Sequence, residues 1–112
     1  MELNSYSSYS TETIASAHWV GKGYSERGTA SADRHSNGWW ISRVLVQPST
    51  MTGKGVGGKL LEMVKMEIKK QGGGTVRVCP GGYDDNKKQQ CNFYRKHGFV
   101  GDLEMKLEIP AG

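Results

Sequence analysis

The sequence is poor in cysteine and proline and contains no long apolar run. Its two cysteines, Cys79 and Cys91, are too few for a disulfide framework, and its three histidines are scattered rather than spaced as metal ligands. No apolar stretch approaches the length that spans a bilayer, and no signal peptide opens the chain. We therefore expect no metal, no membrane partner and a location in the cytoplasm.

Length and composition indicate one small globular domain over residues 1–112. Hydrophobic residues make up 36% of the chain, which is enough for one modest core. The net charge of +4 suits an anionic ligand. The lysines and arginines are dispersed rather than gathered in a stripe, so nucleic acid is not an expected partner.

The beginning of the chain carries few signs of regular structure. Residues 1–13, rich in Ser, Thr and Tyr, are expected to form a loose N-terminal arm, or a weak edge strand over 5–11. Apolar anchors predict a strand over 14–20. The Gly, Ser, Asp, Arg and Asn that dominate residues 21–38 predict a loop.

A strand, a helix and a second strand follow in that order. Aromatic and β-branched residues predict a strand over 39–46, which Pro48 ends. Apolar residues at spacings of three and four predict a helix over 55–71. A short strand over 75–79 then predicts a right-handed crossover and a parallel pair. The buried face of the helix is expected to contain Val56, Leu60, Leu61, Val64 and Ile68.

The last third of the chain adds one helix and one strand. A helix over 87–97 follows a polar loop, in which Asp84, Asp85 or Asn86 can cap it. Alternating apolar residues over 103–109 predict a strand with one buried face, which is typical of antiparallel pairing. The expected fold class is therefore α/β (α+β), with a mixed central sheet of about five strands flanked by helices.

The turn before the first helix carries the strongest functional signal. Four of the six residues from Gly53 to Gly58 are glycine, which allows positive φ and lets a ligand approach the backbone closely. The first amides of a helix have no partner within it, and the helix dipole adds partial positive charge there. We therefore expect this turn to bind a phosphorylated ligand.

Two common phosphate-binding patterns match the turn only in part. Gly53, Gly55 and Gly58 satisfy the dinucleotide pattern G-x-G-x-x-G, but the preceding loop is too long and the next strand ends without an acidic residue. Residues 53–59 also match G-x-x-x-x-G-K, but Leu60 replaces the Ser or Thr that holds magnesium. We reject both interpretations.

Two motifs together resemble the GNAT-type N-acetyltransferase superfamily. Pro48 followed by Gly53-Lys-Gly-Val-Gly57 resembles its motif A, and Asn92-Phe-Tyr94-Arg-Lys96-His-Gly98-Phe99 resembles its second motif, Y-x-K-x-G-F. The resemblance covers about residues 39–107, and the short stretch before it indicates a member with a reduced N-terminal half. It implies a GNAT-like fold and acetyl-CoA (coenzyme A) as co-substrate.

The resemblance also implies an activity. The expected enzyme is an N-acetyltransferase that transfers an acetyl group from acetyl-CoA to a primary amine of a small molecule or peptide, by direct attack in a ternary complex. The alternative is a non-catalytic CoA-binding or protein-interaction module on the same fold. We further expect a homodimer, which would complete the acceptor pocket or cover an exposed sheet.

The roles of individual residues are carried over from the family motifs. The resemblance implies that the turn amides hold the diphosphate, that the preceding strand contacts the pantetheine arm and the thioester, and that Tyr94 is the general acid. The residues expected to contact the cofactor are Leu45, Val46, Thr52, Gly53, Lys54, Gly55, Val56, Gly57, Gly58, Lys59, Asn86, Tyr94 and Lys96.

The chain departs from the family pattern in four places. The loop after Pro48 has about one residue more than usual. Thr52 stands where the family usually has Gln or Arg. Lys87 stands where an asparagine is expected, with Asn86 beside it. The residues before Trp39 lack a helical apolar pattern, so the helices that usually precede the central hairpin are expected to be missing.

The general base is not evident from the sequence. His18, Glu12 and Glu26 lie in the region expected to face the acceptor, although each is more often a plain surface residue, and a chain of water molecules is the alternative. Cys79 ends a strand near the expected thioester, but a buried structural cysteine is commoner there than a nucleophile.

Overall fold

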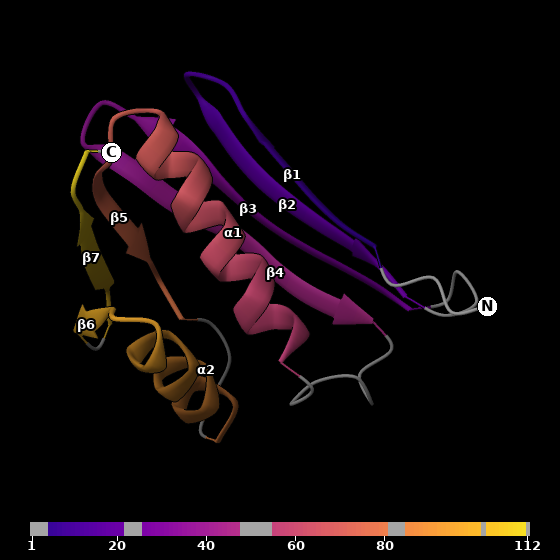
Figure 1. The fold of residues 1–112 in the computed structure, drawn as a ribbon. Coiled ribbons are helices and arrows are strands. Elements are labelled where there is room, and N and C mark those ends of the chain that lie inside the picture. The colour runs from indigo at the N-terminus through magenta and orange to yellow at the C-terminus, as the bar shows by residue number, and fades with distance from the viewer. Residues whose placement is uncertain (1–4, 22–25, 48–54, 81–84, 102, 112) are drawn as a thin grey trace.

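The computed structural model describes residues 5–21, 26–47, 55–80, 85–101 and 103–111. In this part of the chain, two helices accompany a seven-stranded sheet with the strand order β1-β2-β3-β4-β5-β7-β6 (Figure 1). The pairing of β4 with β5 is parallel, and all other neighbours are antiparallel. The elements are β1 (Ser5–Ser10), β2 (Ile14–Val20), β3 (Arg27–His35), β4 (Gly38–Gln47), α1 (Val56–Lys70), β5 (Gly74–Val78), α2 (Asp85–Lys96), β6 (Val100–Gly101) and β7 (Met105–Ile109).

The predicted mixed α/β class is confirmed, with seven strands where about five were expected. The prediction of a loop over residues 21–38 was wrong, because β3 occupies much of that range. Small buried residues, Gly28, Ala30 and Ala32, alternate there with more exposed polar ones. A Cβ on Gly28 would lie 2.7 Å from Leu60 Cδ1, so only a very small residue fits beneath α1. A strand whose inward face is this small shows no hydrophobic periodicity.

The N-terminal arm is an edge strand, one of the two alternatives expected for it. β1 pairs with β2 along its whole length. The hydroxyl groups of Ser8 and Ser10 donate to the two carboxylate oxygens of Glu67 on α1, each at 2.8 Å. Glu67 is only 5% exposed, and Lys70 Nζ lies 3.2 Å from its Oε2. This buried carboxylate explains why a serine-rich segment docks onto the helix.

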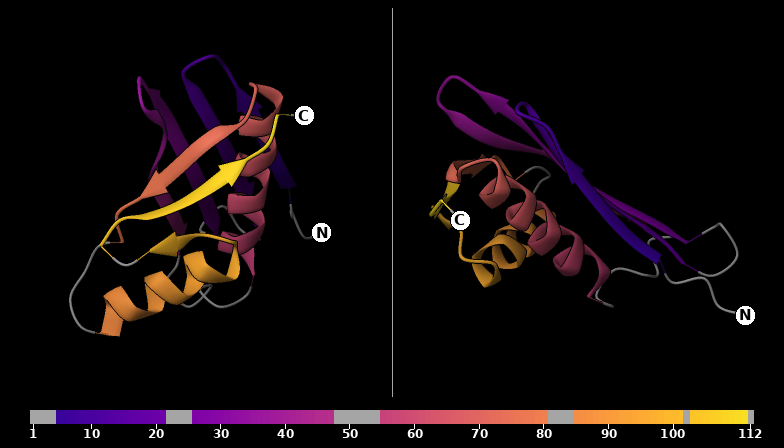
Figure 2. Two further views of the ribbon diagram at one scale, coloured as in Figure 1. Left: turned by 90° about the vertical axis from the view of Figure 1, so that its left-hand side faces the viewer. Right: turned by 45° about the horizontal axis from the view of Figure 1, so that its top comes forward.

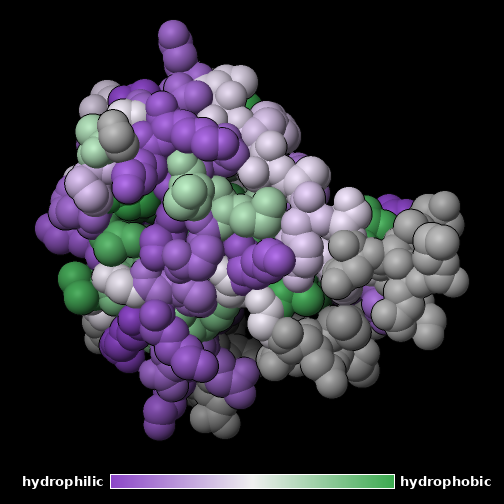
Figure 3. Space-filling view, in the orientation of Figure 1, coloured by the Kyte–Doolittle hydropathy of each residue, from purple (hydrophilic) through white to green (hydrophobic). Residues whose placement is uncertain are grey.

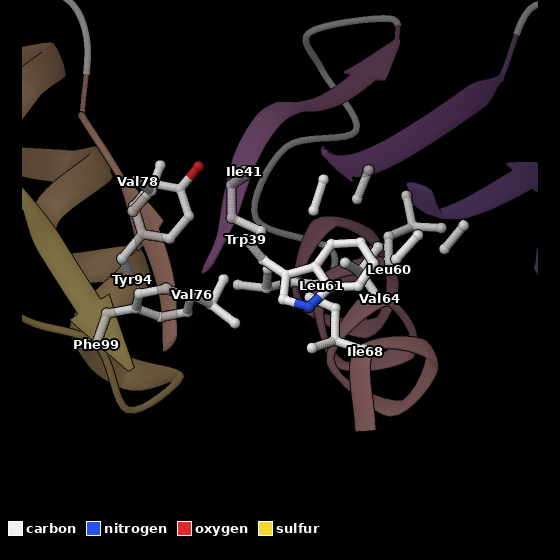
Figure 4. Packing of buried hydrophobic residues seen from close by; sticks show 14 of the residues in the cluster. Trp39, Ile41, Leu60, Leu61, Val64, Ile68, Val76, Val78, Tyr94 and Phe99 are labelled. Carbon is white, nitrogen blue, oxygen red and sulfur yellow. The ribbon is translucent and has the colours of Figure 1, made fainter. Parts of the chain in front are cut away.

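Helix α1 covers one face of the antiparallel strands and forms the centre of the core (Figure 2). The apolar positions that were predicted to be buried on it are all buried. Trp39 of β4, 1% exposed, packs into the same cluster, which continues to Tyr94 and Phe99 (Figure 4). Neither described helix lies on the opposite face of β1 to β4 (Figure 2).

The parallel contact between β4 and β5 is short. Only Trp39 with Val76 and Trp40 with Arg77 are in register. Beyond these pairs β4 continues to Gln47, β5 ends at Val78, and the two strands diverge (Figure 1). The predicted parallel pair is therefore confirmed, and so is the antiparallel pairing predicted for the last strand, whose partner is β5.

The surface over the two helices is mostly hydrophilic, with small apolar patches (Figure 3). Neither helix in the described ranges is long and apolar enough to cross a membrane.

Glu67→Gln should destabilise the domain by about 1–3 kcal/mol, because a carboxylate that accepts hydrogen bonds from Ser8, Ser10 and Lys70 is lost. Burial alone raises the pKa of Glu67, but these hydrogen bonds outweigh it and hold the pKa below its ordinary value. The stabilisation is therefore present above the ordinary value and is lost as pH falls through the lowered one.

Urea unfolding at pH 7 and at pH 3, with hydrogen exchange of the β1 amides, tests this expectation. Glu108→Gln is the control, since its exposed carboxylate accepts only the hydroxyl of Thr75 among the described residues. Equal stability of the wild type and Glu67→Gln at pH 7 would contradict a stabilising role for the hydrogen bonds to Glu67.

Candidate active site

The first turn of α1 presents amides without partners in the helix. Gly55 is the N-cap residue, with φ of 85° and no side-chain cap. The first intrahelical bond runs from Lys59 N–H to the carbonyl of Gly55, at 3.0 Å. The N–H groups of Val56, Gly57 and Gly58 therefore precede the hydrogen-bonded ladder, and the first turn contains no acidic residue. This geometry favours an anion.

A cleft of about 520 Å³ opens at this turn, between the end of β4 and α2. A Cβ on Gly57 would project between its walls, 3.7 Å from Val44 and Val46 and 3.8 Å from Phe93. The absence of a side chain at Gly57 thus keeps the cleft open. Its lining residues are Val44, Val46, Gly55, Gly57, Gly58, Gln89, Gln90, Phe93, Tyr94, Lys96 and His97.

A second cleft, of about 460 Å³, lies where β4 and β5 have separated. It shares Val44, Gln90 and Tyr94 with the first cleft. The two clefts therefore meet in the gap between the diverging strands. The remaining lining residues of the second cleft are Ile41, Ser42, Arg43, Leu45, Val78 and Cys79.

The open stretch of β4 carries a bulge. Ser31 pairs with Arg43 and Ala32 with Ile41, so Ser42 is an extra residue on β4. After the bulge, Val46 lines the first cleft and Leu45 lines the second. Since β5 does not pair with β4 beyond Trp40, the backbone groups there that point away from β3 are available to an extended ligand.

Tyr94 stands where the two clefts join. Its ring is 6% exposed and makes edge-on contacts with Phe93 and Phe99, with centroid distances of 5.1 and 5.5 Å. Figure 4 shows its hydroxyl group pointing away from Phe99, toward the side on which Ile41 of β4 lies. Burial raises the pKa of Tyr94 above its ordinary value, so the hydroxyl stays protonated at neutral pH.

Comparison with known families agrees with this geometry. The model of the acetyltransferase (GNAT) domain matches residues 14–101. The chain belongs to the GNAT acetyltransferase family. Membership supports acyl transfer as the general class of reaction, and GNAT domains generally use acetyl-CoA as co-substrate and take an acceptor substrate.

A solved structure and the curated proteins complete the comparison. The GNAT chain is similar to the crystal structure of the anti-CRISPR protein AcrVA5, with a TM-score of 0.59 and 17% identity over 91% of this chain and 97% of that one. At this identity the likeness concerns the fold alone. No curated protein matches the chain.

The structure brings several of the predicted cofactor residues of this GNAT domain together. Gly55, Gly57, Gly58, Tyr94 and Lys96 line the first cleft. The side chain of Val56 is buried in the core, so its N–H is the group that it offers. Asn86 lies in the first turn of α2. Thr52, Gly53 and Lys54 lie outside the described residues.

The side chain of Lys59 points away from the first cleft. Its Nζ sits 4.1 Å from the centroid of the Tyr6 ring on β1, and it does not line the cleft. Its N–H is also taken by the carbonyl of Gly55. Lys59 follows the glycines in sequence, but one further residue along a helix turns the side chain by about 100°, here toward the edge strand.

None of the candidates for a general base lines the two clefts that Tyr94 lines, but His18 lines a neighbouring cleft with Arg43 and Leu45, which also line the second. His18 bonds Ser16 Oγ at 2.9 Å and Thr29 Oγ1 at 3.3 Å on β2 and β3. Neither His18, Glu12 nor Glu26 lines a cleft that Tyr94 lines. Cys79, expected to be buried, is exposed beside the second cleft, and Cys91 is buried. No group of three or more metal-binding side chains occurs within the described ranges.

Some residues that line the first cleft were not predicted from the sequence. Gln90, Phe93 and His97 line the first cleft beside the predicted Tyr94. Gln90 lies three and four residues before Phe93 and Tyr94, so the helical period read from Tyr94 contained the signal for Gln90 and Phe93. His97 follows directly after the last residue of α2.

Gly57→Glu should lower the affinity for CoA about 100-fold or more, equivalent to about 3 kcal/mol, because it places bulk and negative charge inside the cleft. Gly57→Ala should lower it less, and without loss of stability, since its methyl group would meet its neighbours at ordinary contact distances. Calorimetric titration with CoA measures both effects.

Met66→Glu is the matched control for added charge, because Met66 lies on the same helix and is 60% exposed. The affinity of Met66→Glu for CoA should stay within about twofold of the wild-type value. If a folded Gly57→Glu protein bound CoA with wild-type affinity, the phosphates of CoA would not bind at the first turn of α1.

Proposed function

We propose that this GNAT domain is an acetyl-CoA-dependent N-acetyltransferase, which acetylates a primary amine of a small molecule or peptide. The observation that carries the proposal is the passage formed by the two clefts, which meet at Val44, Gln90 and Tyr94 where the strands diverge. One end of the passage lies at the helix amides that have no partner within α1, and the other at the open edge of β4. Clefts of about 300–1,000 Å³ are typical of ligand sites.

The end of the passage at α1 suits the diphosphate of CoA. Gly57 allows close approach to the amides of the first turn, which carries no acidic residue that would repel an anion. Lys96 adds a cation to the wall of the cleft. These features support anion binding through backbone N–H groups and one lysine.

The gap between the strands suits acyl transfer. Acetyl-CoA supplies an acetyl group activated as a thioester. In direct attack, the amine nitrogen bonds to the carbonyl carbon, the carbon–sulfur bond breaks, the amine loses a proton and the leaving thiolate gains one. The unpaired N–H groups of β4 near Leu45 and Val46 are suitably placed to polarise the thioester carbonyl.

We propose that Tyr94 interacts with the leaving thiolate. An ordinary phenol has a pKa of about 10 and an ordinary thiol about 8.5, so complete proton transfer to a thiolate is unfavourable by about 2 kcal/mol. Burial, which raises the pKa of Tyr94, increases that difference. Tyr94 therefore acts chiefly as a hydrogen-bond donor to the thiolate as negative charge develops on it.

The alternative is a non-catalytic CoA-binding or protein-interaction module on the same fold. It is favoured by one observation, that none of the three expected bases lines either cleft. A chain of water molecules through the exposed second cleft is the base that the enzyme would use. We also keep the homodimer as a proposal, because neither described helix covers the far face of β1 to β4 (Figure 2).

Turnover tests the enzyme against the module. Acetyl-CoA is incubated with a panel of small amines and peptides, and release of the free thiol is followed. Tyr94→Phe should lower kcat about 10- to 100-fold, the effect of losing one hydrogen bond to a charged group, while CoA affinity stays within about twofold.

The substitution keeps the ring and its contacts with Phe93 and Phe99, so the fold should be unaffected. CoA binding without thiol release from any amine would favour the module. Unchanged kcat in Tyr94→Phe would return Tyr94 to a packing role.

A further inference from the structure

His97 is held between the two helices, beside the first cleft. Its Nδ1 lies 2.7 Å from Glu62 Oε2 on α1. Lys65 Nζ bonds the same carboxylate oxygen at 2.9 Å and the carbonyl of His97 at 3.0 Å. The Phe93 ring packs against the imidazole, with a centroid distance of 5.0 Å. The imidazole is therefore fixed in position, although its side chain remains 19% exposed.

The opposite side of the imidazole faces the start of α1. A Cβ on Gly58 would lie 3.0 Å from Nε2 and 3.1 Å from Cε1 of His97. Gly58 is the third residue of the helix, and its N–H precedes the first intrahelical bond. Nε2 thus borders the place where the unpaired amides meet the cleft, which His97 also lines.

The contact with Glu62 determines what Nε2 can offer. A carboxylate at Nδ1 accepts the proton on that nitrogen, and an imidazolium carries a second proton on Nε2. In that form Nε2–H is a second donor, directed at the first turn of α1. Burial raises the pKa of Glu62, but hydrogen bonds from Lys65 and His97 outweigh this and lower it, so the carboxylate is ionised at neutral pH.

We propose that His97 binds the diphosphate of CoA as a cation, and that Glu62 is the residue that positions and charges it. The proposal rests on the proposed CoA-binding function. It assigns to α2 a charged side-chain contact for the diphosphate, in a chain that has Thr52 where Gln or Arg is usual.

The proposal makes the affinity for CoA depend on pH. The charged groups that face His97 are Glu62 and Lys65 from α1, and Lys96 lines the same cleft from α2. A cationic His97 attracts the diphosphate and a neutral one does not. Affinity should therefore fall as rising pH removes the proton from the imidazolium.

A ligand series locates the contact. Dissociation constants of the wild type and His97→Gln are measured by calorimetry for CoA, for dephospho-CoA, which lacks the 3′-phosphate, and for pantetheine, which lacks the diphosphate. His97→Gln should weaken CoA and dephospho-CoA equally, by about 10- to 100-fold, and leave pantetheine unchanged. A loss confined to CoA would place His97 at the 3′-phosphate and overturn the proposal.

The variant Glu62→Gln tests whether Glu62 acts by positioning His97 or only through its own negative charge. Removing a negative charge near an anion site should by itself tighten CoA binding, whereas loss of a positioning residue should weaken it. We expect weaker binding, a smaller pH dependence between pH 6 and pH 8.5, and no further loss when Glu62→Gln is added to His97→Gln. Tighter binding in Glu62→Gln would contradict its role.

The outcomes separate this inference from the proposed function. If the wild type does not bind CoA, the proposed function fails. If the wild type binds CoA and a folded His97→Gln binds it equally well, only the role of His97 fails. Thermal unfolding of each variant establishes that it is folded, since Glu62, Lys65 and His97 also tie α1 to α2.

Discussion

The short parallel contact between β4 and β5 determines what the domain can do. Two pairs of residues hold these strands together, and beyond them each strand has a free edge facing the gap. A longer ladder would close the gap and consume the backbone groups that an extended ligand needs. Because α1 begins close to the end of β4, the amides of its first turn, which have no partner within the helix, lie at one mouth of the same gap. Geometry alone therefore connects these amides to an open strand edge.

The antiparallel half of the sheet supports α1 with unusually small side chains. Gly28, Ala30 and Ala32 lie beneath the helix, and a Cβ on Gly28 would collide with Leu60. Small residues bring the helix close to the strands, but they contribute little apolar area. Polar contacts add to the packing at the edge, where Ser8 and Ser10 bind the buried Glu67. The N-terminal half is thus reduced to strands and lacks a helix within the described residues.

The elements that could be predicted are those in which large apolar residues recur at a regular spacing. The helix at 56–70 was predicted because large apolar residues recur at spacings of three and four, and the strand at 105–109 because they alternate. β3 escaped prediction because its inward residues are small and its outward residues are polar. Periodicity is read from large apolar side chains, and the inward face of β3 has none.

Only part of the candidate site was predictable from the sequence. The glycines at the start of α1 could be predicted because unpaired amides are a property of every helix beginning. The direction of the Lys59 side chain and the position of His97 were not predicted, for another reason. Where each side chain points depends on its neighbours, Tyr6 for Lys59 and Glu62 for His97, which are distant in sequence. Pairwise contacts of this kind have no local signature.

The central claim is that unpaired amides at the start of α1 hold the diphosphate of a ligand that runs between β4 and β5. Amide chemical shifts measured during titration of ¹⁵N-labelled protein with CoA test it most directly. The claim predicts the largest shifts at Val56, Gly57 and Gly58, with smaller ones along β4 near Leu45 and Val46, and pantetheine should move only the β4 signals. Shifts confined to other parts of the domain, or none at saturating CoA, would contradict it.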